Sequence, residues 1–219
     1  MASRPKHAEP RPQPRLYLMT PRVAEAAAWR EPLAAALAAG DIAAVLLRLA
    51  DSDERAQTNI AKTLLAVTQN NDVALLLDGH AELVARAGCD GAHLTGTDAF
   101  KDALGTLKPE RIAGAGGLDT RHDAMSAAEA GADYVMFGEP DENGERPDFA
   151  MIEERIAWWA EVFEAPCVAY AGDLEEIAPL VRAGADFIAL GDWIWRDPPT
   201  IASVIADAAQ RMRLPEPTA

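Results

Sequence analysis

Short apolar runs alternate with longer stretches in which apolar residues recur at helical spacing, and this alternation occurs eight times along the chain. The apolar runs predict strands at 16–20, 43–48, 73–77, 92–94, 111–114, 134–138, 167–170 and 187–190. The amphipathic stretches predict helices at 23–39, 53–68, 81–87, 100–107, 121–130, 149–163, 174–183 and 198–212. Eight strand-then-helix units predict a single-domain α/β fold, the (β/α)8 TIM barrel. An open doubly wound sheet is disfavoured because Pro21 and Arg22 follow the first strand, where that fold carries a Gly-rich turn.

Three segments of the form Ala-Gly-Ala/Cys-Asp, at 87–90, 130–133 and 183–186, each join a predicted helix to the next strand. Glycine suits the end of a helix because it adopts the left-handed backbone conformation without a Cβ clash. The joins mark where strands begin, which is the end of a barrel that serves stability rather than chemistry. We therefore expect their aspartates, Asp90, Asp133 and Asp186, to form turns or to bind backbone groups.

Length and charge narrow the classes of protein further. The 219 residues suffice for one barrel over 15–214, with a Pro- and Arg-rich tail at 1–14 that we predict to be disordered and a short tail at 215–219. A net charge of -15 argues against nucleic acid or an anionic membrane as a partner. We expect no membrane span and no secretory signal. Cys89 and Cys167 lie far apart at predicted strands, which favours reduced, buried thiols and a cytoplasmic location.

The chemistry of a barrel is expected where its strands end and the helices have not yet begun. These positions carry Thr20 and Arg22, Arg48, Asp78 and His80, Thr95 to Asp98, Gly114 to Gly117, Gly138 and Glu139, Tyr170 to Asp173, and Gly191 to Trp193. No lysine ends a predicted strand, which argues against a Schiff-base aldolase. No cluster of His and Cys has the spacing of a zinc site.

The segments LLLDGHAELVARAGCDGAHLTGTD (75–98), AAEAGADYVMFGEP (127–140) and VRAGADFIALGDWI (181–194) carry a family resemblance. In their order and strand spacing the chain resembles the thiamine phosphate synthase family, which also includes a group of thiazole tautomerases. The resemblance covers most of the chain from Leu16 onward. It implies a (β/α)8 barrel that joins a pyrimidine pyrophosphate to a thiazole phosphate, releases pyrophosphate and is assisted by Mg²⁺.

The resemblance places an anion contact and a metal site at three positions. Of the family's Gln-x-Arg-x-Lys after the second strand this chain keeps only Arg48, a candidate catalytic and pyrophosphate-binding residue; pairing of Arg48 with a carboxylate is the alternative. Asp78 and Asp98 stand near the family's two magnesium ligands, although Gly79 occupies one of the aligned positions. Capping of the following helices by these aspartates is the alternative.

The resemblance also implies phosphate contacts near the later strands. Where the family has Gly-x-Ser after the fifth strand, the chain has Gly114 and Gly116, so the serine hydroxyl is missing but backbone N–H groups remain for a phosphate. After the seventh and eighth strands, Gly172 and Gly191 permit close approach of a phosphate. Their candidate neighbours are Arg22, whose cation favours an anion, and Asp192, whose charge opposes one.

Two further positions bear on the reaction. The family's Thr-x-Thr-Lys loop after the sixth strand is replaced by the acidic segment 138–146, in which Arg146 either restores part of the positive charge or lies in a solvated turn. His93 is a candidate catalytic residue, or else a packed, hydrogen-bonded core residue.

Three functions stay open at this point. The chain is a synthase, a diverged barrel that binds a small thiamine-related or phosphorylated ligand, or a tautomerase or isomerase with His93 or Glu139 as base. In each case the expected partner is a phosphorylated small molecule, and a homodimer stays open.

Overall fold

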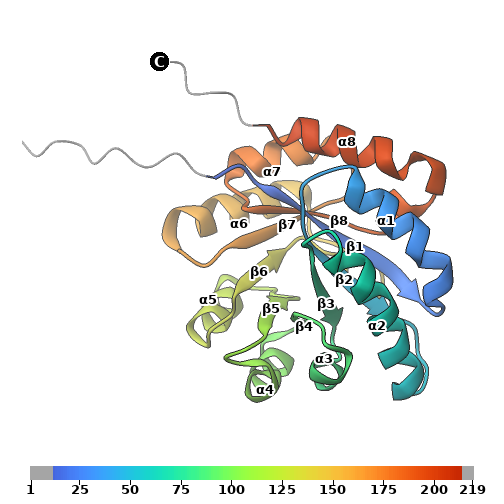
Figure 1. Ribbon diagram of the computed structural model, residues 1–219. Helices are drawn as coiled ribbons and strands as arrows, with labels where there is room; N and C mark the ends of the chain where they lie inside the picture. Colours follow the sequence, from blue (N-terminus) through green and yellow to red (C-terminus); the bar gives the residue numbers. More distant parts are fainter. Residues whose placement is uncertain (1–11, 214–219) are drawn as a thin grey trace, which may run out of the picture.

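Eight parallel strands close into a barrel in the computed structural model, which describes residues 12–213 (Figure 1). The strands are β1 (Arg15–Val23), β2 (Ile42–Leu49), β3 (Ala74–Asp78), β4 (Gly91–Thr95), β5 (Ile112–Gly116), β6 (Tyr134–Phe137), β7 (Cys167–Ala171) and β8 (Phe187–Leu190). Each strand pairs with its neighbour in sequence order, and β8 pairs with β1. The predicted single-domain (β/α)8 barrel is confirmed.

The helices lie around the outside of the barrel (Figure 1). The α-helices are α1 (Arg30–Ala38), α2 (Glu54–Gln69), α3 (Ala81–Ala87), α4 (Thr97–Leu107), α5 (Arg121–Glu129), α6 (Phe149–Val162), α7 (Ile177–Ala183) and α8 (Ile201–Arg211). Short 3₁₀ helices η1 (Ala26–Trp29), η2 (Asp192–Trp195) and η3 (Pro198–Thr200) complete the set.

The largest departure from the predicted elements concerns the first helix. It was expected from residue 23, but β1 continues to Val23 because its end still pairs with β2, Arg22 opposite Arg48 and Val23 opposite Leu49. A 3₁₀ turn then leads into α1 at Arg30. Because the helix starts later than expected, Arg22 lies near the end of a strand and lines the cavity formed with the loops that follow the other strands.

Two apolar layers hold the fold together. The inside of the barrel is filled by Tyr17, Met19, Ala44, Leu46, Leu76, Tyr134, Met136, Val168, Tyr170 and Ala189. A larger layer packs the outward faces of the strands against the helices, with Leu75, Leu77, Phe137 and Trp159 among its buried members. This alternation along each strand is what a barrel requires, since successive side chains point to opposite faces.

The Ala-Gly-Ala/Cys-Asp joins have the predicted geometry. Gly88 and Gly184 end α3 and α7 in the left-handed conformation. The carboxylates of Asp90, Asp133 and Asp186 accept hydrogen bonds from the backbone N–H groups of residues 75, 113 and 167, at 2.8, 2.7 and 2.8 Å. Each aspartate thus fixes the start of one strand against a neighbouring strand, and the expectation that they bind backbone groups is confirmed.

The remaining sequence expectations concern the ends and the thiols. The predicted disordered tail at 1–14 falls largely, and the tail at 215–219 entirely, outside the described residues. Cys89 and Cys167 are buried and are not joined in a disulfide. Among residues 12–213 no helix is long and apolar enough to cross a bilayer.

Candidate functional site

The ends of the strands surround one large cavity of about 1230 Å³. Its lining includes Arg22 and Arg48 from β1 and β2, Asp78 and Gly79 at the end of β3, His93 within β4, Glu139 after β6, and Gly172, Gly191 and Asp192 after the last two strands. Most of the predicted strand-end positions therefore meet at a single site, as the barrel geometry requires. Gly114, Gly116 and Asp98 do not line the cavity.

Arg48 is held between two carboxylates. Its Nη1 donates to Oδ1 of Asp192 at 3.1 Å, and its Nε lies 3.4 Å from Oδ2 of Asp78. The buried Nε has no hydrogen-bond partner among the described residues, although it faces the Asp78 carboxylate. The geometry is that of the carboxylate-pairing alternative, and an anion would have to compete with both acids for this guanidinium.

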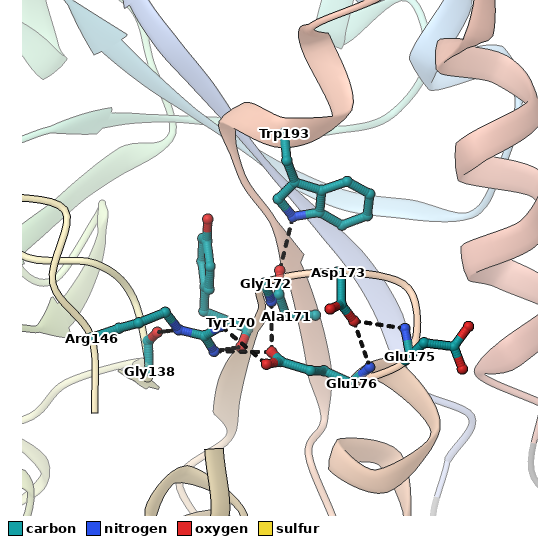
Figure 2. Close-up of polar contacts among 9 residues, drawn as sticks. All are labelled: Gly138, Arg146, Tyr170, Ala171, Gly172, Asp173, Glu175, Glu176 and Trp193. Atoms are coloured by element: carbon teal, nitrogen blue, oxygen red, sulfur yellow. Dashed lines mark hydrogen bonds and ion pairs between the residues drawn. The ribbon is translucent and has the colours of Figure 1, made fainter. Parts of the chain in front are cut away.

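The phosphate position expected at Gly172 carries a carboxylate of the chain itself (Figure 2). The Gly172 N–H donates to Oε2 of Glu176 at 2.7 Å. Arg146 binds the same carboxylate with both terminal nitrogens, Nη1 to Oε1 at 3.2 Å and Nη2 to Oε2 at 3.0 Å. The Gly172 N–H and the Arg146 guanidinium together form an anion-binding site, and the carboxylate of Glu176 from the same chain occupies it.

Arg146 is tied to the barrel, with 22% of its side chain exposed, whereas residues 141–145 of its loop are exposed, as expected for a solvated turn. Its Nε donates to the Gly138 carbonyl at 3.1 Å and its Nη2 to the Tyr170 carbonyl at 3.2 Å. The guanidinium also lies over the Tyr170 ring, 5.2 Å from its centroid. These contacts fasten the acidic segment 138–146 to the end of β7 (Figure 2).

The end of β8 is shaped by aromatic side chains. Gly191 is a close-approach position, because a Cβ there would lie 2.4 Å from the Tyr170 hydroxyl oxygen. The indole of Trp193 donates to the Ala171 carbonyl at 2.9 Å, and that of Trp195 donates to the Met19 carbonyl at 2.8 Å. Both indoles are therefore anchored to strand carbonyls, at the end of β7 and within β1, and help to hold η2 against the barrel.

His93 belongs to a buried hydrogen-bonded chain inside the barrel. Its Nδ1 lies 3.0 Å from the Tyr134 hydroxyl, which lies 2.8 Å from the Tyr17 hydroxyl. The His93 and Tyr134 rings stack with centroids 5.7 Å apart. Gly114 makes room for this, since a Cβ there would overlap the Tyr134 ring. Burial lowers the pKa of His93 from 6.5 to about 4, so the imidazole is neutral at physiological pH.

Glu139 lies next to His93 on the cavity wall. Its Oε1 accepts a hydrogen bond from the Gly117 N–H at 2.6 Å. Burial raises its pKa from 4.5 to about 7, and the negative charge of Asp78 adds to the rise, while the Gly117 hydrogen bond and Arg155 oppose it. A carboxyl group with this pKa exchanges a proton readily near neutral pH.

The two aspartates expected to bind Mg²⁺ are not arranged as a metal site. Asp78 is paired with Arg48, while Asp98 lies exposed in the first turn of α4. Within residues 12–213 no group of three or more His, Cys, Asp or Glu side chains is placed to hold a metal ion. The oxygen ligands that Mg²⁺ prefers are therefore not assembled by these side chains.

Several residues of the site carried no clear sequence signal. Glu176 and Tyr134 lie within segments that read as ordinary helix and strand, and Arg196 follows the last strand at a distance. Arg22 and Arg196 line the cavity, are exposed and form no ion pair within the described part of the chain. The half-buried Arg155 also lines the cavity without an ion pair, but its terminal nitrogens donate to the carbonyls of Leu118 and Asp119 at 2.7 and 2.8 Å. Arg22 and Arg196 are thus the exposed arginines of the lining whose charge is not taken up by a carboxylate of the described residues.

Comparison with known proteins agrees with this architecture. A family model described as thiamine monophosphate synthase matches residues 16–194. A thiamine-phosphate synthase of Rhodospirillum centenum is 42% identical over 202 residues, which cover 91% of this chain and 98% of that protein. A thiamine-phosphate synthase of Hyphomonas neptunium is 39% identical, with 86% and 89% covered.

A solved structure shows the same fold. The thiamine phosphate pyrophosphorylase from Pyrococcus furiosus superposes with a TM-score of 0.77 at 21% identity, over 91% of this chain and 96% of that one. The family match and the two relatives each extend over most of the barrel. The chain therefore belongs to the thiamine monophosphate synthase family.

Proposed function

We propose that this chain is a thiamine-phosphate-synthase-type transferase that joins a pyrimidine pyrophosphate to a thiazole phosphate and releases pyrophosphate. The observation that carries the proposal is the 42% identity to the Rhodospirillum centenum enzyme over 98% of that enzyme's length. Similarity over a whole barrel includes the loops after the strands, where barrel enzymes keep their chemistry.

The cavity supports binding of phosphorylated small molecules. Its volume of about 1230 Å³ exceeds the ~300–1,000 Å³ usual for a single small ligand, which leaves room for two substrates side by side. Arg22 and Arg196 would attract the phosphate groups, because their guanidinium charges are not neutralised by ion pairs of the described residues. The neutral His93 and the Tyr170 ring would pack against the heterocycles.

The side chains present do not fit the Mg²⁺ that the family resemblance implies, since Asp78 is paired with Arg48 and Asp98 lies outside the cavity. Assays with and without Mg²⁺ should show a smaller metal dependence than two dedicated aspartate ligands would produce.

A second candidate is a barrel that binds a phosphorylated ligand without joining two substrates. It is favoured by one observation: the arginines deepest in the site, Arg48 and Arg146, are both held by carboxylates of the chain. A pyrophosphate leaving group would have to displace those acids, whereas a single phosphate could be bound at Arg22 and Arg196 alone.

The two candidates separate in one experiment. The purified protein is incubated with both substrates and Mg²⁺, pyrophosphate release is followed, and thermal shifts are measured with each substrate alone. The synthase proposal expects release that falls strongly in R22A and not in R86A, an outer-surface arginine paired with Glu54. A thermal shift without any pyrophosphate release at high enzyme concentration supports the binding protein and rejects the synthase.

The cellular setting follows as part of the same proposal. Buried thiols at Cys89 and Cys167, not joined in a disulfide, support a reducing cytoplasmic location. A homodimer stays a prediction, to be checked by light scattering.

A further inference from the structure

The donors at the end of β7 would suit a phosphate as well as they suit a carboxylate. The Gly172 N–H and both terminal nitrogens of Arg146 converge on the Glu176 side chain (Figure 2). A phosphate oxygen accepts from the same kinds of donor, because it also carries negative charge. Gly172 and Arg146 both line the cavity, so this position is within reach of a ligand there.

The donors are held in place by contacts that do not involve Glu176. Arg146 donates to the carbonyls of Gly138 and Tyr170, and its guanidinium lies over the Tyr170 ring. Gly172 directly follows β7, and a Cβ there would overlap Nη1 of Arg146, so a glycine is what lets the guanidinium approach this backbone. The donors should therefore keep their places when the carboxylate is removed.

Glu176 is an anion that the chain holds at this position. Oδ1 of Asp173 accepts from the N–H groups of Glu175 and Glu176 at 2.8 and 3.1 Å, which fixes the turn that carries the side chain (Figure 2). A tethered group competes with an effective concentration on the order of millimolar or more. A free phosphate would have to displace this competitor, and beside it would be repelled by its like charge.

We propose that Glu176 is a specificity-determining residue that excludes phosphate from the end of β7, so that a phosphorylated ligand places its phosphate at Arg22 and Arg196. Both of these arginines line the cavity, and no carboxylate of the described residues takes up their charge. The Tyr170 ring and the Trp193 indole line the cavity beside the neutralised ion pair, and they suit an uncharged ring of the same ligand.

The Gly172 amide signal reports directly on this position. The full chain, labelled with ¹⁵N, is titrated with inorganic phosphate, and that signal is followed by NMR. We expect no shift in the parent chain. In E176A we expect a shift that saturates, with phosphate bound at least about tenfold more tightly at this position than in the parent. The matched control is E175A, which removes an exposed neighbouring acid and should behave as the parent does.

Two further variants assign the effect and guard against loss of folding. E176Q keeps the length of the side chain and an acceptor oxygen but removes the charge, and we expect an intermediate gain in phosphate binding. The double variant E176A/R146Q should lose the gain, because the guanidinium supplies the positive charge of the site. A Gly172 shift in the parent equal to that in E176A overturns the exclusion of phosphate by Glu176. No shift in folded E176A or folded E176Q overturns the anion-binding position itself.

The assigned phosphate position is tested in the same titration by calorimetry. R22A/R196A should bind inorganic phosphate at least about tenfold more weakly than the parent chain. Parent binding that is absent, or that survives in R22A/R196A, overturns this assignment. The inference does not rest on the proposed synthase reaction, since only phosphate binding is measured. A parent chain that releases no pyrophosphate would reject the synthase and leave these results unchanged.

Discussion

The two ends of this barrel use the same side chain for opposite purposes. At the end where strands begin, Asp90, Asp133 and Asp186 turn their carboxylates onto backbone N–H groups. At the end where strands finish, Asp78 and Asp192 turn theirs onto the guanidinium of Arg48. In the first case the acid fixes the chain; in the second it controls how much positive charge the cavity offers to a ligand.

The difference follows from what each end leaves unsatisfied. A strand that begins beside a neighbour has backbone N–H groups without a ladder partner, and a carboxylate just before the next strand in sequence can accept from them. Strand ends at the mouth carry arginines instead, and a cation in a cavity attracts nearby acids. Acids at the mouth, where strands finish, therefore set ligand affinity. Acids at the opposite end, where strands begin and which we call the closed end, set the register of the sheet.

Glu176 lies at the mouth but also binds a backbone N–H, as the acids of the closed end do. Its removal should cause the largest loss of unfolding free energy among the variants considered. It sits at the mouth but accepts from the backbone N–H of Gly172 as well as from Arg146, with its side chain only 18% exposed. E176A leaves both donors without their acceptor, and we expect a loss of about 2–4 kcal/mol of unfolding free energy, measured by urea denaturation. E175A is the matched control, because that neighbouring acid is 82% exposed and pairs with Arg211. Its loss should be under about 1 kcal/mol. Equal losses would show that Glu176 is an ordinary surface acid.

Glu139 should make the free energy of unfolding depend on pH. Its pKa is raised from 4.5 to about 7 on folding, so between these pH values the folded state binds more protons than the unfolded state. The free energy of unfolding therefore falls as pH rises from 4.5 to 7, by about 2–3 kcal/mol once solvent screening is allowed for.

The variant E139Q isolates this contribution. Glutamine cannot ionise, but its carbonyl oxygen can still accept from the Gly117 N–H. Denaturation at a series of pH values should show E139Q gaining stability relative to the parent chain between pH 5 and pH 8. His93 acts in the opposite direction, since its lowered pKa destabilises the folded state as pH falls from 6.5 to 4. A constant difference between E139Q and the parent across this range would contradict the raised pKa.

The contacts at the closed end could be predicted from the sequence, whereas the ion pairs at the mouth could not. Gly88, Gly184 and the aspartates beside them act on neighbours fixed by the repeating strand–helix unit, so a local pattern predicted both conformation and partner. The contact between Arg146 and Glu176 joins residues 30 apart in sequence, on different loops. No period or motif relates them, and only the closed barrel brings them together.

The same reasoning explains two site predictions. Arg48 was predicted at the mouth because it ends a strand, which depends on the strand alone; that Asp192, 144 residues later, would bind it depends on closure of β8 onto β1. Gly116 was expected to expose its backbone to a phosphate, but the side chains of His93 and Glu139 lie over it. A glycine in sequence permits close approach without saying what approaches.

Asp90 should show how much an aspartate at the strand-start end of the barrel contributes to the free energy of unfolding. Its carboxylate accepts from the N–H of Leu75, a fully buried strand residue, at 2.8 Å. D90A leaves that N–H buried without an acceptor, and we expect a loss of about 1–3 kcal/mol by urea denaturation, with ligand binding at the mouth unchanged. D90N keeps an acceptor oxygen and should recover most of the loss. If D90A weakened phosphate binding as much as it weakened folding, the separation of the two ends would be wrong.

Asp192 should have the smallest effect on stability and the most specific effect on binding. Its side chain is 54% exposed, so the ion pair with Arg48 contributes at most about 1 kcal/mol and D192N should unfold at nearly the same urea concentration as the parent. The freed guanidinium then keeps only Asp78, and inorganic pyrophosphate should bind a few-fold more tightly by isothermal titration, with D197N as an exposed control acid outside the cavity. R48A should abolish the gain in the double variant, because the gain acts through that cation. Tighter binding that survives the loss of Arg48 would instead mean that the acid repels anions from the whole mouth.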